Sequence, residues 1–399
     1  MTLNEIAKAI GVVKYDSIPE KMFDYYPVPE NRKSELCSIE MIDHLQKKFC
    51  LFGDYYDAVK ACWFAVQQDE YRKTWLDVVS LYMIDNDYEQ LMKIPVLKLD
   101  GNLAGDLLQL FMHLPSVEAA YTNYVKRGFS EQYALEIMQA YYSSLDHVSR
   151  SVKGRPALTG MYFRWLCHYT KANIFRCCGF NFELRTFTDA YILKNKQTGS
   201  ILPISNDQII HRSGVPLGSA GATDSHEAFY AQFKETQDAY IGYPVVAHRF
   251  AATETNFYKS EWDLLMKPGD TALAIHIPKQ ANISPENISC VLNEAQTLAH
   301  KYYSDYTPKM FFCFSWMLCP DLCEMLHSGA NLVRFGNLFT RFPKKSEGKG
   351  VFTFVFPQGF NGSLEQLPED TSLRRAVKQR YLSGGHILDY AGVIEFLSF

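Results

Sequence analysis

Residues 271–318 contain two strand-like segments separated by one amphipathic helix, and this unit constrains the fold more than any other part of the sequence. In residues 271–277 bulky apolar side chains alternate with small ones, which is the period of a β-strand, and residues 310–318 alternate in the same way. Between them, a serine, a proline and a glutamate at 284–286 predict the start of a helix that continues with an apolar stripe. A strand, a helix and a strand in this order predict two parallel strands joined by a right-handed crossover.

The segments after this unit continue the alternation of helices and strands. Pro320 begins a predicted short helix at 321–327. Residues 332–341 and 351–356 have the apolar runs expected of two further strands. The predicted order from residue 271 onward is therefore strand, helix, strand, helix, strand, strand.

The first half of the sequence has a different period. Up to residue 180, apolar residues recur every three to four positions, as they do in amphipathic helices. The predicted helices cover 38–50, 55–67, 74–84, a segment capped by Ser130, and 161–177. Strand-like runs then follow at 182–187, 190–193, 201–202 and 207–211. Because 399 residues exceed the size of one typical core, we predict an α+β protein: an all-helical N-terminal domain at 1–180, and a mixed α/β domain at 181–399 built around the central βαβ unit.

Several short motifs of the second half are shared with a known family. They are His276-Ile277-Pro278, Ser284-Pro285-Glu286, the run 313–318 with Pro320 and Leu322, the segment 331–335, Trp262 before 268–270, and the tail 382–386. The order of elements resembles the second half of the GNAT superfamily of N-acyltransferases. A closer resemblance is to bacterial acyltransferase-domain proteins, which have a helical N-acyltransferase-type N-terminal domain and a GNAT-like C-terminal domain. The resemblance covers about residues 261–392 and is weaker in the first half, where it lies mainly at 165–183.

The resemblance implies how a co-substrate would be bound. In GNAT enzymes the two parallel strands separate at their C-terminal ends, the pantetheine arm of acyl-CoA enters the gap, and the next helix directs its N-terminus at the pyrophosphate. For this sequence it implies acyl-CoA or acetyl-CoA as co-substrate, held by Ile275, Ile277, Lys279 and Ser284, and a small-molecule amine as acceptor. The loop 278–283 departs from the family, because it has none of the glycines that let a backbone approach phosphate closely, and Lys279 could supply charge instead.

Three residues at the ends of the two strands are candidates for catalysis. His276 ends the small face of the first strand, and its imidazole could take a proton from an attacking amine near neutral pH. The alternative is a histidine that makes only structural hydrogen bonds. Cys313 and Ser315 share one side of the second strand and could polarise the thioester, protonate the leaving thiolate or act as nucleophile. The alternative for Cys313 is packing as a small apolar residue.

Three polar residues are candidates for binding the acceptor. Arg334 could hold a carboxylate or a phosphate through paired hydrogen bonds, with Asn331 close by in the sequence. Glu261, next to Trp262, is an alternative base. The competing interpretations are an arginine that pairs with a surface acid and a glutamate exposed in a turn.

Composition and missing motifs argue against several other classes of function. The net charge of −4 and the scattered lysines and arginines argue against nucleic-acid binding, and no run reaches the roughly 20 apolar residues of a membrane span. Ten cysteines at irregular positions and the absence of a secretory leader favour a cytoplasmic location. The sequence lacks zinc-binding spacings, nucleotide-binding glycine motifs and the G-x-S-x-G elbow, so we expect no metal site and no serine hydrolase.

Two hypotheses for function follow from these observations. The first is a cytoplasmic acyl-CoA-dependent N-acyltransferase that transfers an acyl group from a CoA thioester to an amine. The second is a non-catalytic binding or scaffold module that has lost its affinity for CoA, as a glycine-free loop would allow. The sequence leaves open the acyl chain, the acceptor and the oligomeric state.

Overall fold

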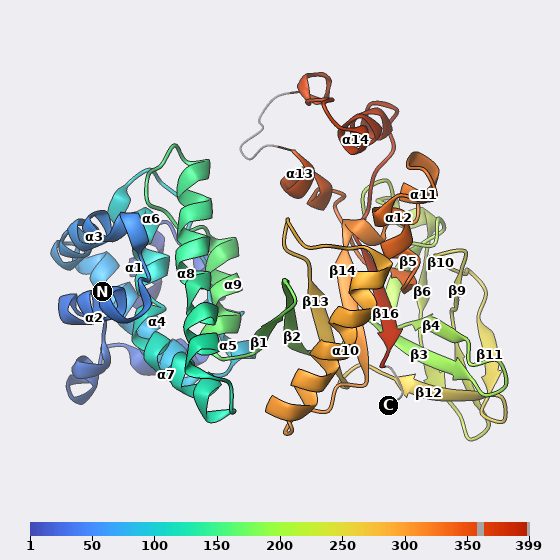
Figure 1. Cartoon of the computed structure of the whole chain (residues 1–399), viewed down its shortest axis with the longest axis horizontal. Coiled ribbons are helices and arrows are strands. Elements are labelled where there is room, and N and C mark those ends of the chain that lie inside the picture. The colour runs from blue at the N-terminus through green and yellow to red at the C-terminus, as the bar shows by residue number, and fades with distance from the viewer. Residues whose placement is uncertain (357–362, 397–399) are drawn as a thin grey trace. The chain divides into compact units, whose positions relative to one another are not determined.

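The chain divides into two compact units, Met1–Phe175 and Arg176–Phe399, which are described separately here. The structure is a computed structural model, and it describes residues 1–356 and 363–396 (Figure 1). The division at Phe175 falls a few residues before the predicted boundary at 180, which lies at the start of a strand, β2 (Phe180–Thr186).

The first unit is built from helices whose ends follow the capping residues of the sequence. Ser38 accepts a hydrogen bond from the Met41 N–H at 3.2 Å, and Ser130 accepts one from the Tyr133 N–H at 3.2 Å. The α-helices are α1 (Leu3–Ala9), α2 (Ile39–Phe49), α3 (Tyr56–Gln68), α4 (Glu70–Asp85), α5 (Tyr88–Leu91), α6 (Leu103–Phe111), α7 (Leu114–Lys126), α8 (Glu131–Ser151) and α9 (Gly160–Thr170). The predicted all-helical first half is confirmed over residues 1–170.

Helix α4 is the centre of this unit. It packs against α1, α3, α6 and α7, and residues on all its sides are buried, including Trp75, Val79 and Tyr82. A helix that is apolar around most of its circumference is expected at the centre of a bundle rather than at its surface.

The last predicted helix of the first half is shorter than expected. We predicted a helix at 161–177, but α9 ends at Thr170 and residues Ile174–Cys177 form the strand β1. Ala172 between them has a left-handed φ of 50°, which a continuing helix does not allow. The apolar residues after Thr170 therefore belong to the edge of a sheet.

The second unit is organised around a six-stranded mixed sheet with the order β1-β2-β13-β14-β16-β15. Its central strands are β13 (Thr271–His276) and β14 (Met310–Ser315), which run parallel and are joined by helix α10 (Pro285–Tyr302). This confirms the predicted βαβ unit. The neighbouring pairs β13–β2, β14–β16 (Tyr390–Glu395) and β15–β16 (Thr340–Pro343 for β15) are antiparallel.

The two faces of this sheet are covered by different layers. Helix α10 lies across one face (Figure 1) and buries its apolar stripe, which includes Ile288, Val291 and Ala295. On the other face, Ala274 and Phe312 belong to a core shared with a second group of strands. Small side chains on β13 therefore allow that second layer to approach closely.

The second layer is formed by the part of the sequence between β2 and β13, and it consists of short antiparallel strands. Their sheets are β12-β3-β4 (Trp262–Met266, Ala190–Asn195, Ile201–Ser205), β5-β6 (Gln208–His211, Ala228–Ala231), β11-β8-β7 (Thr255–Tyr258, Ala239–Gly242, Lys234–Glu235) and β10-β9 (Arg249–Phe250, Val245–Val246). The strands predicted at 182–187, 190–193, 201–202 and 207–211 all correspond to strands of the structure, so the change of period after residue 180 is confirmed.

Two of the predicted strands beyond β14 are wrong. Residues 332–341 form helix α12 (Asn331–Gly336) followed by β15, and residues 351–355 lie in helix α13 (Gly350–Val355), with Phe356 as its C-cap. Both runs are short, and short apolar runs do not distinguish a strand from a buried turn of helix. The predicted helix at 321–327 is the short α11 (Leu322–Met325). Two further elements, α14 (Ser372–Leu382) and β16, were not predicted.

Candidate active site

The central strands β13 and β14 separate at their C-terminal ends. They pair with each other only from Ala272 with Met310 to Ala274 with Phe312. Beyond this point β13 stays paired with β2 as far as His276, and β14 stays paired with β16 as far as Ser315. Two strands that keep their outer neighbours but lose each other must diverge. Their facing backbone groups beyond Ala274 and Phe312 therefore have no partner in the β13–β14 ladder.

His276 lies at this divergence and is paired with a buried carboxylate. Its Nε2 is 2.7 Å from Oε2 of Glu183, a residue of β2. The side chain of His276 is 34% exposed, whereas that of Glu183 is only 7% exposed. A buried carboxylate fixes the orientation of an imidazole and stabilises the imidazolium that forms when the ring takes a proton. The pair is therefore suited to act as a general base at the end of β13.

Glu183 was not among the predicted site residues. The available signal was a charged residue between the apolar residues Phe182 and Leu184 of a predicted strand. Its partner could not be identified from the sequence, because Glu183 pairs in register with Ala274 and reaches His276 from the neighbouring strand. That register is a long-range property of the sheet.

Cys313 and Ser315 lie on the opposite face of the sheet from His276. Ala274 pairs with Phe312, so His276, two residues further along, shares the face of Phe312, while Cys313 and Ser315 point the other way. Cys313 is 1% exposed, and burial raises the pKa of its thiol to about 12. A thiol with such a pKa stays protonated at neutral pH and is a poor nucleophile.

Ser315 has a structural role at the end of β14. Its Oγ accepts a hydrogen bond from the Met317 N–H at 3.2 Å, and the chain then enters the 3-10 helix Trp316–Leu318. The strand predicted at 310–318 therefore ends at Ser315. The structure does not bring His276 together with Cys313 or Ser315 on one face.

The residues predicted to hold CoA follow one another from β13 into α10. Ile275 is buried in β13, Ile277 and Lys279 lie in the loop after it, and Lys279 is exposed. This loop is a defined turn, in which the Ala281 N–H donates to the Pro278 carbonyl at 2.9 Å. Ser284 caps α10 by accepting a hydrogen bond from the Asn287 N–H at 3.4 Å.

An acid already lies at the N-terminus of α10. Glu286 is in the first turn, where a hydrogen bond to its own backbone N–H and then the nearby Arg334 lower the pKa of its carboxyl group. Arg334 Nη2 is 2.6 Å from Glu286 Oε1. Arg334 and Asn331 lie on α12, not on a strand as predicted, and Arg334 makes the surface ion pair that was its alternative interpretation.

Glu261 lies in a different sheet from His276. It is the exposed residue just before β12, in a turn where its N–H donates to the Tyr258 carbonyl at 2.9 Å. This matches the competing interpretation of Glu261 as an acid exposed in a turn. Of the ten predicted site residues, His276, Ile275 and Ile277 are those that the structure places on or directly after the diverging end of β13.

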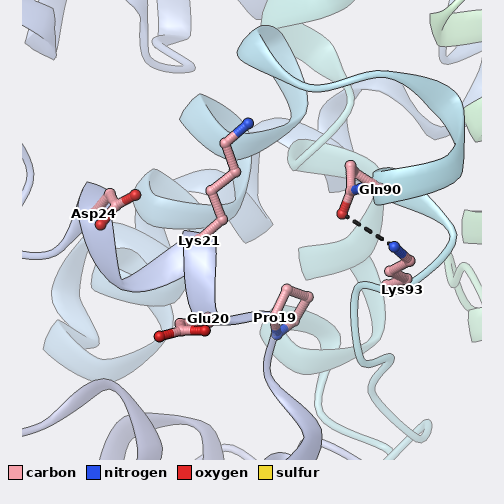
Figure 2. A pocket seen from close by; sticks show the side chains of 6 residues that line it. All are labelled: Pro19, Glu20, Lys21, Asp24, Gln90 and Lys93. Atoms are coloured by element: carbon pink, nitrogen blue, oxygen red, sulfur yellow. Dashed lines mark hydrogen bonds between the residues drawn. The ribbon is translucent and has the colours of Figure 1, made fainter.

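A pocket of about 530 Å³ lies in the first unit and was not predicted. Figure 2 shows its lining, which is polar and consists of Pro19, Glu20, Lys21, Asp24, Gln90 and Lys93. Lys21 Nζ donates to Asn86 Oδ1 at 2.9 Å, and Lys93 Nζ donates to Gln90 Oε1 at 3.4 Å. Both lysine ammonium groups of this lining are therefore hydrogen-bonded to neutral side-chain amides.

Within residues 1–356 and 363–396, no three histidine, cysteine, aspartate or glutamate side chains are grouped so that they could hold a metal ion. Over the same ranges, every helix is too short or too polar to cross a bilayer.

Comparison with known proteins links this geometry to one family. The family model described as the GNAT-like C-terminal domain matches residues 175–394. A crystal structure of an acyltransferase in complex with decanoyl-CoA and teicoplanin is similar over 100% of both chains, with 15% identity and a TM-score of 0.65. A crystal structure of an acyltransferase mutant in complex with octanoyl-CoA is similar over the same extent, with 15% identity and a TM-score of 0.66. No curated protein matches the sequence.

Proposed function

This chain belongs to the family with the GNAT-like C-terminal domain, and from that premise we propose that it is an acyl-CoA-dependent acyltransferase that acylates an amine. The observation that carries this proposal is the end of the β13–β14 ladder after Ala274 and Phe312. Similar solved structures support it, because they are acyltransferases in complex with decanoyl-CoA or octanoyl-CoA.

The diverging strands would hold the pantetheine arm. An arm with two amide groups can hydrogen-bond to strand backbone groups that have lost their ladder partners, and this mode of recognition adds an extended ligand to an open strand edge. Lys279 and the N-terminal turn of α10 would approach the phosphates, with Ile275 and Ile277 beside the arm. Since loop 278–283 has no glycine, charge rather than close backbone approach would contribute most of the phosphate binding.

The His276–Glu183 pair would supply the base. An amine must lose a proton to attack a thioester carbon, and the imidazole takes that proton while the Glu183 carboxylate stabilises the resulting charge. The tetrahedral intermediate places negative charge on the former carbonyl oxygen, which a strand N–H would stabilise. The carbon–sulfur bond then breaks, and the CoA thiolate leaves.

The acyl donor and the cellular location are also part of the proposal. Decanoyl-CoA and octanoyl-CoA in the similar structures suggest a medium-length acyl chain as the first donor to test. All ten cysteines are free thiols, which fits a cytoplasmic enzyme in a reducing compartment. The acceptor would be a small-molecule amine.

One observation favours the alternative of a non-catalytic binding module. The N-terminus of α10 carries Glu286, and Arg334 is engaged by that acid instead of being directed at a ligand. Both features weaken an anion site at this helix end. A protein that had lost CoA binding could retain this arrangement without cost.

Ligand-dependent stabilisation separates the two proposals. Decanoyl-CoA at about 100 times its dissociation constant should stabilise the folded protein by about 2.7 kcal/mol and raise its melting temperature. Decanoic acid and free CoA at equal concentration serve as controls for the two halves of the ligand. If neither decanoyl-CoA nor acetyl-CoA at millimolar concentration changes the melting temperature, the enzyme proposal is wrong and the scaffold proposal stands.

A further inference from the structure

A second group of polar side chains lies around the strands β15 and β16, and the proposed chemistry does not use it. It consists of His248 and Arg249 at the β9–β10 hairpin, Arg341 in β15, Tyr390 in β16 and Asp321 just before α11, and we refer to it as the arginine cluster. Its elements β10, α11 and β16 are labelled in Figure 1.

The register of the sheet places this cluster relative to the diverging strands. Tyr390 pairs directly with Ser315, the last residue of β14. Gly392 pairs with Cys313 on one side and with Arg341 on the other. Directly paired residues share a face, so Arg341 and Tyr390 lie on the face of Cys313 and Ser315.

Arg341 is a buried positive charge with no acidic partner among the residues that the structure describes. It is only 7% exposed. Its Nη2 lies 3.3 Å from His248 Nε2 and 3.1 Å from Asn337 Oδ1, which are both neutral acceptors. Among the described residues its Nε has no hydrogen-bond partner. Buried guanidinium groups are normally paired with carboxylates or phosphates, because an uncompensated charge is costly to bury.

Tyr390 provides a second, independent sign of a missing partner. Its side chain is fully buried, and its hydroxyl has no hydrogen-bond partner in the part of the chain that the structure describes. Buried tyrosine hydroxyls usually find a partner. The guanidinium carbon of Arg249 lies 5.9 Å from the centre of the Tyr390 ring, so one positive charge of the cluster lies over this side chain.

The local charges do not balance. Asp321 is shared by Arg380, which bonds to it directly, and by Arg249, whose Nη2 is 3.9 Å from Asp321 Oδ1. Arg341 adds a third guanidinium group to this region, and among the described residues no carboxylate pairs with it. A purely structural ion-pair network would not leave such an excess of positive charge beside an unsatisfied hydroxyl.

The hairpin that presents His248 is held in a costly conformation. Ala247 and His248 both have left-handed φ values, 46° and 64°. A two-residue hairpin requires left-handed φ at both central positions, and histidine tolerates this region better than most residues, so the cost falls mainly on Ala247. The conformation places the His248 ring against Arg341, which fixes the direction of the guanidinium.

We propose that the arginine cluster binds a compact oxyanion, a carboxylate or a phosphate. Arg341 and Arg249 would contribute the charge, and the Tyr390 hydroxyl would donate a hydrogen bond to the same group. The position beside Ser315 makes the anion part of a substrate, either a phosphate of CoA or an acidic group of the acceptor. That assignment to a substrate rests on the proposed function, whereas the anion site itself does not.

The test is phosphate binding by the full-length protein. Melting temperatures are measured with increasing inorganic phosphate or acetate, and with chloride at equal ionic strength as the reference. We expect phosphate to raise the melting temperature, and Arg341→Met and Tyr390→Phe to weaken its apparent affinity at least about tenfold. Arg212→Met, which removes an exposed arginine paired with Glu227, should bind phosphate as the unmodified protein does.

Tyr390→Phe distinguishes an anion site from a structural role. Because the hydroxyl has no partner to lose among the described residues, this variant should melt at the same or a higher temperature without phosphate and gain less when phosphate is added. No response to either anion, or an equal response in all four proteins, overturns the proposal. A Tyr390→Phe variant that is destabilised without phosphate and still responds fully to it also overturns the proposal.

Titration calorimetry with CoA and with pantetheine identifies the source of the anion. If Arg341→Met weakens CoA binding about tenfold or more and leaves pantetheine binding unchanged, the site holds a phosphate of CoA. If CoA binding is unchanged while the phosphate response is lost, the site holds an acidic group of the acceptor. If the protein responds to phosphate but binds no acyl-CoA, the proposed function is wrong and the anion site is still supported.

Discussion

The His276–Glu183 pair concentrates the proposed chemistry in two residues. His276→Ala should lower kcat by about 10²- to 10⁴-fold with little change in the KM for acyl-CoA, since general-base catalysis typically contributes that much. Glu183→Gln should lower kcat in the same direction by a smaller factor, because the neutral amide can orient the ring but cannot stabilise its positive charge. Steady-state kinetics with decanoyl-CoA and an amine acceptor measure both effects.

A second histidine–carboxylate pair provides the matched control. His44 and Glu118 of the first unit form a similar contact at an exposed position. His44→Ala should leave kcat unchanged. If His276→Ala were as active as His44→Ala, the imidazole would have no part in the reaction.

Cys313 tests whether an acyl-enzyme forms. Burial raises the pKa of its thiol to about 12, so at pH 8 only about one thiol in 10⁴ is ionised. Cys313→Ala should therefore keep kcat within about twofold of the unmodified enzyme, and mass spectrometry after mixing with decanoyl-CoA should show no acyl group on Cys313. An acylated Cys313 peptide would contradict direct attack by the amine.

His113 makes the stability of the first unit depend on pH. It is fully buried, with Nδ1 2.8 Å from Thr170 Oγ1 and Nε2 3.1 Å from the Phe163 carbonyl oxygen, and burial lowers the pKa of its imidazole to about 3. The unfolded chain takes up a proton below its ordinary pKa of about 6.5, and the folded chain does not. The free energy of unfolding therefore has its full value, as far as His113 is concerned, above pH 6.5, and it falls as the pH drops from about 6.5 towards 3.

At pH 5 this linkage should have cost roughly 2 kcal/mol of the free energy of unfolding. Urea unfolding of the helical unit followed by circular dichroism between pH 5 and 8 measures it. His113→Gln should be less stable at pH 8 and should lose less stability at pH 5 than the unmodified protein. Parallel pH dependences in the two proteins would show that His113 does not carry the effect.

At the residue scale, the sequence predicted which face of a strand a residue occupies better than it predicted which side chain that residue contacts. The alternation of residues 271–277 correctly indicated that His276 ends the small face of its strand, where Ala274 lies in the shared core. Glu183 escaped prediction because its contact with His276 depends on the pairing of β2 with β13, which the local pattern does not contain. The contact between Arg341 and His248, which joins β15 to the distant β9–β10 hairpin, could not be predicted for the same reason.

Helix α10 is the element that decides how phosphate can be bound. Its first turn carries Glu286, whose carboxylate would repel the phosphates of CoA at the helix end. Glu286→Gln should therefore tighten CoA binding by a few-fold, and the gain should shrink as the salt concentration rises. Titration calorimetry at two ionic strengths measures it.

The control for this prediction lies on the same helix. Glu294 is exposed in the middle of α10, away from its N-terminal turn, so Glu294→Gln should leave CoA affinity unchanged. Equal affinities for Glu286→Gln and the unmodified protein would mean that the phosphates do not approach this end of α10.

At the element scale, capping residues predicted the starts of helices correctly, whereas short apolar runs did not predict strands reliably. Ser284 and Pro285 gave the correct start of α10. In contrast, residues 351–356 are rich in aromatic and β-branched residues and predicted a strand, yet they lie in a helical turn where Phe352 and Phe356 stack four positions apart. Packing overrides β-propensity in such short segments.

The whole molecule combines a helical unit with a sheet whose middle is assembled from distant parts of the chain. The sequence predicted both units and the central βαβ crossover, because long periodic segments carry a strong signal. It did not predict that the C-terminal strand β16 lies between β14 and β15. That placement is set by antiparallel pairing with β14, more than 70 residues earlier in the sequence.

The central claim is that acyl-CoA binds between the separated ends of β13 and β14, and amide hydrogen exchange tests it most directly. Adding decanoyl-CoA should slow exchange in peptides that cover residues 275–279 and 313–316 by at least about tenfold, because the ligand would bond to amides that lack a ladder partner. Peptides from β3 and β4 should exchange at unchanged rates. Binding of decanoyl-CoA without protection at either strand end would contradict the claim.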